Sequence, residues 1–579
     1  MNIYEIEREV YKALPESLIG DDFAKTFKLL LAPVEFGDFS LSISFKLAKV
    51  LKKSPTDIAN LIIQNLKSEY FETLSNDKGY INIRVNSKFY KEFIQDLLEK
   101  KENYFYFPST GKKIQVEFVS ANPTGPLHVG NGRGGAIGDV VANLLKTRGY
   151  SVEREYYVND AGNKMDLLGA SIRFFYLERF GIEVEFPEEG YKGDYIKAVA
   201  DKISSVFGER FVHNDEKKQI ETFKLLGEYL LFGKTYKTSE EIEILKNVPP
   251  FEMDSILKVL EKFGIQYDNV FFESSLYEGK PKVFEGTVSL PPKLVDVLEI
   301  LKERGYLYEL DGAFWFKSTI FGDDKDRVLV KATGEPTYTL TDIAYHIDKF
   351  NRGFSKVIDV WGADHFGHVT TMKALLEGVG IGKDFLDVIL YQIVHLFEEG
   401  TEVMMSKHTG KFYTLSELIK EVGKDAARFF FLMKSADSHL NFDIDLAKKE
   451  SVDNPVYYVQ YTYARFNNIV SEAEKRKTEF VNIEEISNAT YEPIERKILD
   501  EIFYFNNYLD DIASNYSIHR VTNLLIDLSK DLNFFYQNYK VLGEENILDR
   551  TKRFLIVKSA LVTLSLLFDI LGIEKREKM

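Results

Sequence analysis

The stretch "KIQVEFVSANPTGPLHVGNGRGGAIGDVVANLLKTRGYSVEREYYV", residues 113–158, decides the fold of the central part of the chain. It opens with the β-branched and aromatic content of a buried strand, and a proline-containing loop follows. Residues 136–150 carry apolar side chains at helical spacing, Gly149 marks the end of this helix, and residues 151–158 predict the next strand. This order predicts a βαβ unit in a parallel sheet, with a ligand site at the carboxyl ends of the strands.

Outside this stretch, the chain predicts a multidomain α/β protein, because 579 residues are too many for one core. The runs "VIDVWGADH" and "VILYQIVHL" predict further strands of the Rossmann-like sheet. We expect a small α/β N-terminal domain over residues 1–105 and the sheet domain over residues 106–423, with a mostly helical insertion at about 170–310. Residues 424–579, rich in Phe and Tyr at helical spacing, predict an all-α C-terminal domain.

Composition and charge exclude several classes of protein. The chain has no cysteine, which removes disulfides, thiolate zinc sites and thiol nucleophiles. A net charge of −16 argues against indiscriminate nucleic-acid binding, so a nucleic-acid partner would need a confined basic surface. The acidic N-terminus is unlike a secretory signal, and Lys558 and Asp569 interrupt the apolar residues 554–573. We therefore expect a cytoplasmic protein with no membrane partner.

The glycines of "HVGNGRGG" leave two alternatives open. Gly130, Gly132 and Gly135 fit the G-x-G-x-x-G fingerprint of dinucleotide binding, and an acid in the next strand could bind the ribose. That fingerprint needs its first glycine directly after the strand, whereas "SANPTGPLH" intervenes here. The other alternative is His128-x-Gly130, which places an imidazole near the phosphates of ATP and leaves room for adenine. It favours an enzyme that adenylates its substrate, and the glycines would then admit ATP.

Several motifs in order resemble one family. "VEFVSANPTGPLHVGNGRGGAIGD" resembles the signature of class I aminoacyl-tRNA synthetases, and within them the arginyl-tRNA synthetases. The second half of that signature, Met405-Ser406-Lys407, follows in "VMMSKHTGKF". Five more segments agree with the arginyl family: "YYVNDAGNKM", "PTYTLTDIAYH", "VWGADHFGHV", "DSHLNFDIDLA" and "DNPVYYVQYTYAR". The resemblance implies an arginine–tRNA ligase that converts ATP, L-arginine and tRNA(Arg) to arginyl-tRNA(Arg), AMP and diphosphate through an arginyl adenylate.

The resemblance also implies an ATP site in which His128 and Lys407 are catalytic. Adenylate formation needs positioning and stabilisation of phosphate charge, which these two donors can supply. Magnesium should arrive with ATP, and no tightly bound protein metal is expected, although Asp364, His365 and His368 form the alternative of a metal cluster. The family more often has His where this chain has Asn131, and many class I enzymes have Lys where it has Met404. The expected ATP contacts are His128, Gly130, Asn131, Gly362, Asp364, His368, Met405, Ser406 and Lys407.

Arginine as substrate demands carboxylates, because its planar guanidinium carries five donors and a fixed charge. By resemblance, Glu117 and Asp342 supply these carboxylates, and Tyr338 lies one helical turn before Asp342. Asn122 is expected to hold the α-amino or carboxylate end of the substrate. The expected arginine contacts are Glu117, Ser120, Asn122, Tyr338, Asp342 and His365.

The implied macromolecular partner is tRNA(Arg). The C-terminal domain resembles the anticodon-binding domain of the family, where aromatic side chains stack on unpaired bases, although helix-period aromatics also serve as core. The N-terminal domain resembles the module that contacts the tRNA elbow, and we expect a monomer. Two other functions stay open: another adenylating enzyme of the superfamily, or a non-catalytic tRNA-binding paralogue. The expected tRNA contacts are Tyr461, Arg465, Tyr536, Tyr539 and Met579.

Overall fold

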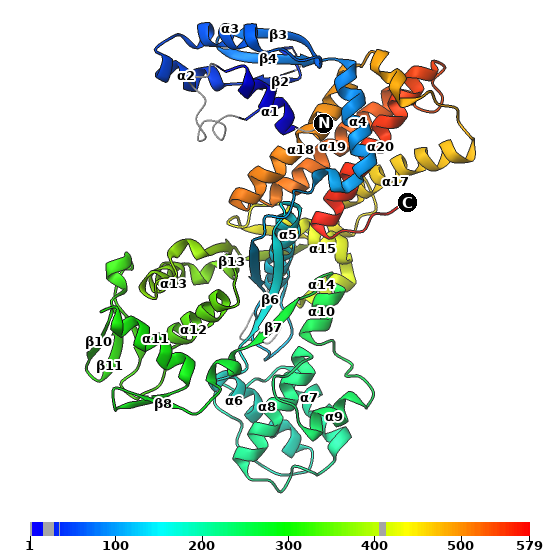
Figure 1. Ribbon diagram of the computed structural model, residues 1–579. Coiled ribbons are helices and arrows are strands. Elements are labelled where there is room, and N and C mark those ends of the chain that lie inside the picture. Colours follow the sequence, from blue (N-terminus) through cyan, green and yellow to red (C-terminus); the bar gives the residue numbers. More distant parts are fainter. Residues whose placement is uncertain (1–2, 15–27, 34, 404–412) are drawn as a thin grey trace. The chain divides into compact units, whose positions relative to one another are not determined.

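The computed structural model describes residues 3–14, 28–33, 35–403 and 413–579, and it divides the chain into two compact units (Figure 1). One unit comprises Pro108–Lys448, and the other combines Met1–Phe107 with Lys449–Met579. The first unit contains a parallel α/β sheet, and the second contains a small antiparallel sheet and a helical bundle. The expected multidomain α/β fold is confirmed.

A five-stranded parallel sheet forms the centre of the first unit, with strand order β14-β13-β5-β6-β7. The quoted stretch folds as predicted, because β5 and β6 pair in parallel and α5 (Val129–Thr147) connects them. The run "VILYQIVHL" differs from the prediction, since it breaks after Tyr391 and continues as a strand of another sheet. The strands of the parallel sheet are β5 (Lys113–Phe118), β6 (Ser151–Val158), β7 (Asn269–Phe272), β13 (Lys356–Gly362) and β14 (Leu386–Tyr391).

Helix α5 packs so closely on its neighbours that glycine is needed along it. A Cβ added to Gly138 would lie 2.2 Å from Cγ of Phe118 on β5. A Cβ at Gly132 would lie 2.6 Å from Leu415, and one at Gly135 would lie 2.9 Å from Ile265. On the side that a Cβ would occupy, Gly132 and Gly135 therefore make room for protein side chains.

Two inserted parts flank β7, which lies inside residues 170–310 and pairs with β6. The first inserted part is helical and has an apolar core of its own. The second contains short antiparallel strands and three helices around another core, and its helix α12 packs against α11 and α13 (Figure 1). The first part contains α6 (Asn163–Glu178), α7 (Asp194–Phe207), α8 (Glu216–Phe232), α9 (Glu240–Lys246) and α10 (Ile256–Lys262). The second contains β8 (Lys282–Phe284), β9 (Val288–Leu290), α11 (Pro292–Glu303), β10 (Leu307–Leu310), β11 (Ala313–Phe316), β12 (Arg327–Val330), α12 (Tyr338–Asn351) and, after β13, α13 (Phe366–Gly378).

The remaining elements of the first unit surround the start of α5. Helices α14 and α15 both pack against α5, and a second sheet has the order β16-β15-β17. These elements are β15 (Val394–Glu398), β16 (Thr401–Glu402), α14 (Leu415–Val422), α15 (Lys424–Leu432), β17 (Leu440–Asp443) and α16 (Ile444–Lys448).

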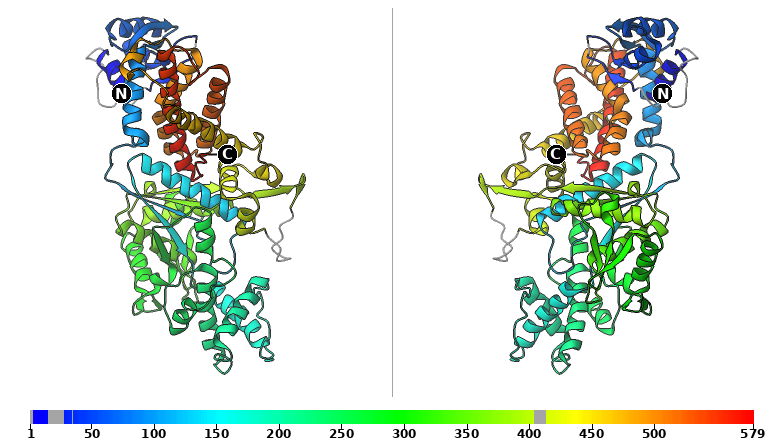
Figure 2. Two further views of the ribbon diagram at one scale, coloured as in Figure 1. Left: turned by 90° about the vertical axis from the view of Figure 1, so that its right-hand side faces the viewer. Right: turned by 90° about the vertical axis from the view of Figure 1, so that its left-hand side faces the viewer.

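The second unit contains the four-stranded sheet β1-β2-β4-β3 and a bundle of four long helices that lie side by side (Figure 2). Its last helix, Ile547–Leu571, is long and apolar enough to cross a membrane, but 67% of its most apolar window is buried inside the structure. This packing supports a core helix. The elements are α1 (Ile3–Lys12), β1 (Leu30–Leu31), β2 (Phe39–Leu41), α2 (Ile43–Leu51), α3 (Pro55–Asn65), β3 (Phe71–Asp77), β4 (Tyr80–Val85), α4 (Ser87–Lys100), α17 (Pro455–Lys475), α18 (Pro493–Asn515), α19 (His519–Asn538) and α20 (Ile547–Leu571).

Candidate active site

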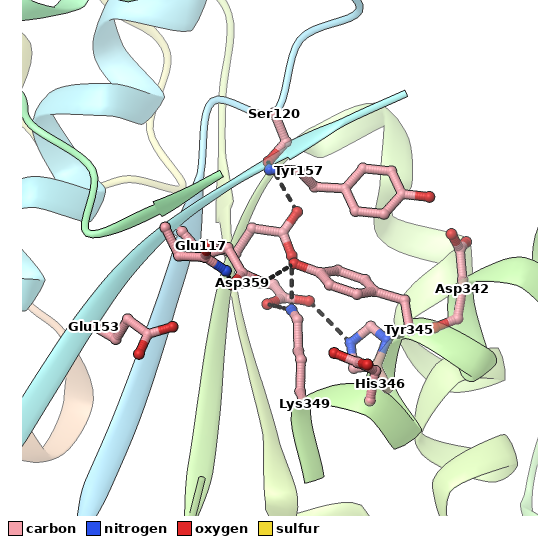
Figure 3. Close-up of polar contacts among 12 residues, drawn as sticks. Glu117, Ser120, Glu153, Tyr157, Asp342, Tyr345, His346, Lys349 and Asp359 are labelled. Atoms are coloured by element: carbon pink, nitrogen blue, oxygen red, sulfur yellow. Dashed lines mark hydrogen bonds and ion pairs between the residues drawn. The ribbon is translucent and has the colours of Figure 1, made fainter. Parts of the chain in front are cut away.

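Three carboxylates lie in register across the centre of the parallel sheet. Glu117 on β5 pairs with Asp359 on one side and with Glu155 on the other, so the three side chains share a face of the sheet. All three are buried. Lys349 on α12 contacts two of them: its Nζ lies 2.6 Å from Glu117 Oε2 and 3.0 Å from Asp359 Oδ1 (Figure 3). Arg352, the residue that follows α12, forms an ion pair with Glu155. We call Glu117, Glu155 and Asp359 the carboxylate row.

Ionisation of Glu117 and Asp359 is governed by burial and by Lys349. Burial raises the pKa of Glu117, the neighbouring Asp359 adds to the rise, and the Lys349 ammonium opposes it. Burial alone would also raise the pKa of Asp359, but Lys349 and the hydrogen bond from His346 bring it below its ordinary value. Burial works against the charge of Lys349, yet the surrounding carboxylates raise its pKa. The row therefore holds a charged lysine inside the protein.

The chain turns sharply where β5 ends. Val119 has φ +70° and Ser120 has φ +39°, and a β-branched residue in this region costs about 1–3 kcal/mol. This turn brings the Ser120 hydroxyl to within 2.9 Å of Glu117 Oε1, to which it donates, while the Tyr157 N–H donates to the same hydroxyl oxygen at 3.1 Å. The predicted arginine contacts Glu117 and Ser120 are thus in direct contact. Asn122 lies half-buried in the loop that follows.

Helix α12 also carries Tyr338 and Asp342, one turn apart as predicted. Asp342 Oδ2 lies 2.9 Å from His368 Nε2, and the ring of His368 lies 5.5 Å from that of Tyr338. His346 connects Asp342 with the carboxylate row, since its ring nitrogens lie 2.8 Å from the main-chain oxygen of Asp342 and 3.1 Å from Asp359 Oδ2. The structure thus links the main chain of Asp342 to the Glu117 carboxylate through His346, Asp359 and Lys349.

Residues after β13 form the edge of this region. Gly362 ends the strand, and a Cβ there would lie 2.5 Å from Asp364 Oδ1. The side chains of Asp364 and His365 are exposed and lie 3.8 Å apart, whereas His368 pairs with Asp342. In the described part of the chain, no three His, Asp or Glu side chains converge as a metal site would require. His368, expected at ATP, is thus placed among the expected arginine contacts.

The His128 loop shows what Asn131 does in this fold. His128 is the N-cap of α5, and its main-chain N–H donates to Asn131 Oδ1 at 3.1 Å, so the Asn131 amide helps to define the start of the helix. A Cβ on Gly130 would lie 3.0 Å from the His128 imidazole, so Gly130 leaves room for that ring. Thr414 pairs with His128 in a short antiparallel bridge. Met405, Ser406 and Lys407 lie outside the described residues.

Sequence reasoning missed the basic residues that hold this region together. Lys349 follows Asp342 by two helical turns, a spacing that places both on one face and could have indicated their connection. Arg133, within "HVGNGRGG", is fully buried and donates to the main-chain oxygens of Gln392, Ser435 and Ser438, each at 2.8 Å. No local pattern indicates these carbonyl partners, because they come from distant loops.

In the second unit, the structure brings three of the five expected tRNA contacts together. Arg465 lies between two phenol rings, at 4.5 Å from the centre of Tyr461 and 4.8 Å from that of Tyr536. Tyr536 is 43% exposed. The ring of Tyr539 instead faces another cation, Arg553, at 5.1 Å. The fifth residue, Met579, is exposed at the end of the chain.

Three family models match the chain. Residues 5–85 match "Arginyl tRNA synthetase N terminal domain", residues 93–189 match "tRNA synthetases class I (R), catalytic domain", and residues 459–579 match "DALR anticodon binding domain". "Arginine--tRNA ligase" of Bacillus velezensis is 39% identical over the full length of both chains, and that of Aquifex aeolicus is 40% identical over 99% of both. The fold matches the arginyl-tRNA synthetase of Thermus thermophilus with a TM-score of 0.73, at 22% identity and full coverage of both chains. The chain belongs to the arginyl-tRNA synthetase family.

Proposed function

We propose that arginine is activated where β5 ends, between the carboxylate row and Asp342. As an arginine–tRNA ligase, the chain converts ATP, L-arginine and tRNA(Arg) to arginyl-tRNA(Arg), AMP and diphosphate through an arginyl adenylate. One observation carries the location of the site: Glu117 and the main-chain oxygen of Asp342, on different elements, are joined through the contacts of Lys349, Asp359 and His346.

Glu117 and Asp342 bind the guanidinium in this proposal. A guanidinium presents several N–H donors in one plane, and two carboxylates from different elements can accept them from two directions. Tyr338 stands at the start of α12 beside His368, so its phenol can close one side of the site. Ser120 orients Glu117, Asn122 holds the α-amino or carboxylate end, and His365 is a further substrate contact.

ATP binds at the start of α5 in this proposal. The arginine carboxylate attacks the α-phosphate and diphosphate leaves, so the protein contributes positioning and charge stabilisation. His128 and Lys407 donate to the phosphates, and magnesium bound to ATP offsets their charge. Asn131 contributes by fixing the N-cap residue His128. The remaining ATP contacts of the proposal are Gly130, Gly362, Asp364, His368, Met405 and Ser406.

The tRNA is bound by the terminal regions. Arg465 with Tyr461 and Tyr536 offers a cation and an exposed ring for an unpaired base, and Tyr539 and Met579 complete the proposed surface. Residues 1–105 contact the tRNA elbow. Residues 106–423 form the catalytic domain and residues 424–579 form the anticodon-binding domain of a cytoplasmic monomer.

Amino-acid-dependent exchange of pyrophosphate into ATP tests this function. We expect exchange with arginine alone among the amino acids, and we expect it to depend on added tRNA(Arg). Asp387→Asn is a matched control for carboxylate variants, since Asp387 pairs with Lys356 outside the site. Exchange with a different amino acid would overturn the proposal, and no exchange with any amino acid in the presence of tRNA would favour a non-catalytic paralogue.

A further inference from the structure

We propose that Lys349 is a positioning residue for arginine: its ammonium pairs with the Glu117 carboxylate and holds it at the end of β5, beside Ser120. This inference rests on the arginine site proposed above. It adds a residue that touches no substrate itself and acts through Glu117.

The contacts of Lys349 explain why it is needed. Carboxylates on neighbouring strands repel one another, and the row places Glu117 between two of them. Arg352 forms an ion pair with Glu155 at one end of the row. Among the described residues, Lys349 is the one cation that forms an ion pair with Glu117. The amine is fully buried, so water does not compete for it.

Lys349 also sets how Glu117 is turned. Its Nζ donates a hydrogen bond to Oε2 of Glu117, and Oε1 accepts one from the Ser120 hydroxyl at the end of the strand, as Figure 3 shows. Asp359 holds the amine from the other side at 3.0 Å and is itself in contact with His346. The ammonium is therefore fixed from two strands and cannot follow Glu117 elsewhere without losing a partner.

Loss of Lys349 would change the charge of Glu117. Burial and the neighbouring carboxylates raise the pKa of Glu117, and Lys349 opposes that rise. Without the amine, burial and the carboxylates Asp359 and Glu155 still raise the pKa of Glu117, so a larger fraction of Glu117 is protonated at a given pH. The groups that face Glu117 besides Lys349 are the carboxylates Asp359 and Glu155 and the phenols Tyr345 and Tyr267.

Aminoacylation by the full-length protein with tRNA(Arg), from pH 6 to 9, tests the inference. Lys349→Met should raise the arginine KM at pH 7 by about 10- to 100-fold, because the guanidinium loses a charged acceptor. That KM should fall as the pH rises and Glu117 ionises, while the ATP KM stays unchanged. Lys349→Arg should restore most of the affinity. The matched control is Lys356→Met, which removes an amine that pairs with Asp387 outside the row.

Two further measurements separate positioning from a merely structural role. Asp359→Asn removes the second partner that fixes the Lys349 amine, so the arginine KM should rise by less than in Lys349→Met while the ATP KM stays unchanged. Citrulline, the neutral ureido analogue of arginine, should be rejected less strongly by Lys349→Met than by the unsubstituted protein, because a protonated Glu117 no longer favours a cation.

An unchanged arginine KM and pH profile in Lys349→Met, together with a raised KM in Glu117→Gln, would overturn the role of Lys349 and leave the proposed function standing. An unchanged KM in Glu117→Gln would instead overturn the arginine site itself. If Lys349→Met does not fold, Lys349→Gln decides the matter: an arginine KM and pH profile equal to those of the unsubstituted protein would refute the inference.

Discussion

Glu228 on α8 should lower the stability of the protein at neutral pH, and Glu228→Gln should relieve this effect. Its side chain is 4% exposed, and Oε1 has no hydrogen-bond partner among the residues that the structure describes. Burial raises the pKa of Glu228 to about 8, Asp160 adds to the rise, and Lys224 opposes it. The folded protein therefore keeps a proton on this carboxyl that the unfolded chain releases.

The magnitude follows from the two pKa values. An acid whose pKa is raised on folding contributes stability that is lost as the pH rises from its ordinary value of 4.5 toward about 8. Each pH unit in this window weakens the fold by about 1.4 kcal/mol. The loss should reach about 3 kcal/mol at pH 7 and level off near about 5 kcal/mol above pH 8. A glutamine does not ionise, so the substituted protein avoids this loss.

Thermal unfolding of both proteins between pH 5 and 9 measures the effect. The difference between the midpoints of Glu228→Gln and the unsubstituted protein should grow with pH up to about 8, since all other titrating groups are shared and cancel. Glu221→Gln is the matched control, because Glu221 is exposed on the same helix. A midpoint difference that does not change with pH, or that shrinks as pH rises, would refute the reasoning.

Three further outcomes are expected. Lys407→Ala should slow pyrophosphate exchange by about 10²- to 10³-fold, and near-normal exchange would remove this lysine from catalysis. Asp342→Asn should raise the arginine KM in aminoacylation by about 10-fold or more because the guanidinium loses a charged acceptor, and an unchanged KM would speak against the site. Gly138→Ala should lower the thermal midpoint through an overpacking cost of about 1–3 kcal/mol, since its Cβ would lie 2.2 Å from Phe118. Gly367→Ala is its control, because a Cβ there meets nothing within 4 Å, and equal midpoints would contradict the packing described for α5.

Local patterns were sufficient to predict the βαβ unit. The two strands and the helix of residues 113–158 each depend on composition and spacing within a few residues, and all three are present. Strand β7 was not predicted, because four residues, Asn269–Phe272, carry no periodic pattern and gain their identity only by pairing with β6. The carboxylate row was missed for the same reason, since it depends on strand order and register.

The glycines of α5 show a second limit of prediction from the sequence. Their spacing predicts a close approach at the start of a helix, and the structure contains such approaches. At Gly132 and Gly135, however, the close neighbours are Leu415 and Ile265, which belong to segments far along the chain. A glycine in the sequence indicates that another group lies close to the backbone at that position. The sequence around the glycine does not identify that group. The role of Asn131 could not be predicted from the sequence either, because its contact with the His128 N–H depends on where the helix begins.

The separate apolar core of the first inserted part has a consequence for protein engineering. Its helices leave the sheet after β6 and return at β7, and their core does not include the carboxylate row. This part therefore packs around a core that is separate from the carboxylate row. The exposed turn between α7 and α8, at Gly208 and Glu209, is a suitable graft point for a fluorescent or affinity module. A fluorescent module inserted there would make the synthetase visible in a cell and would add no group beside the arginine site.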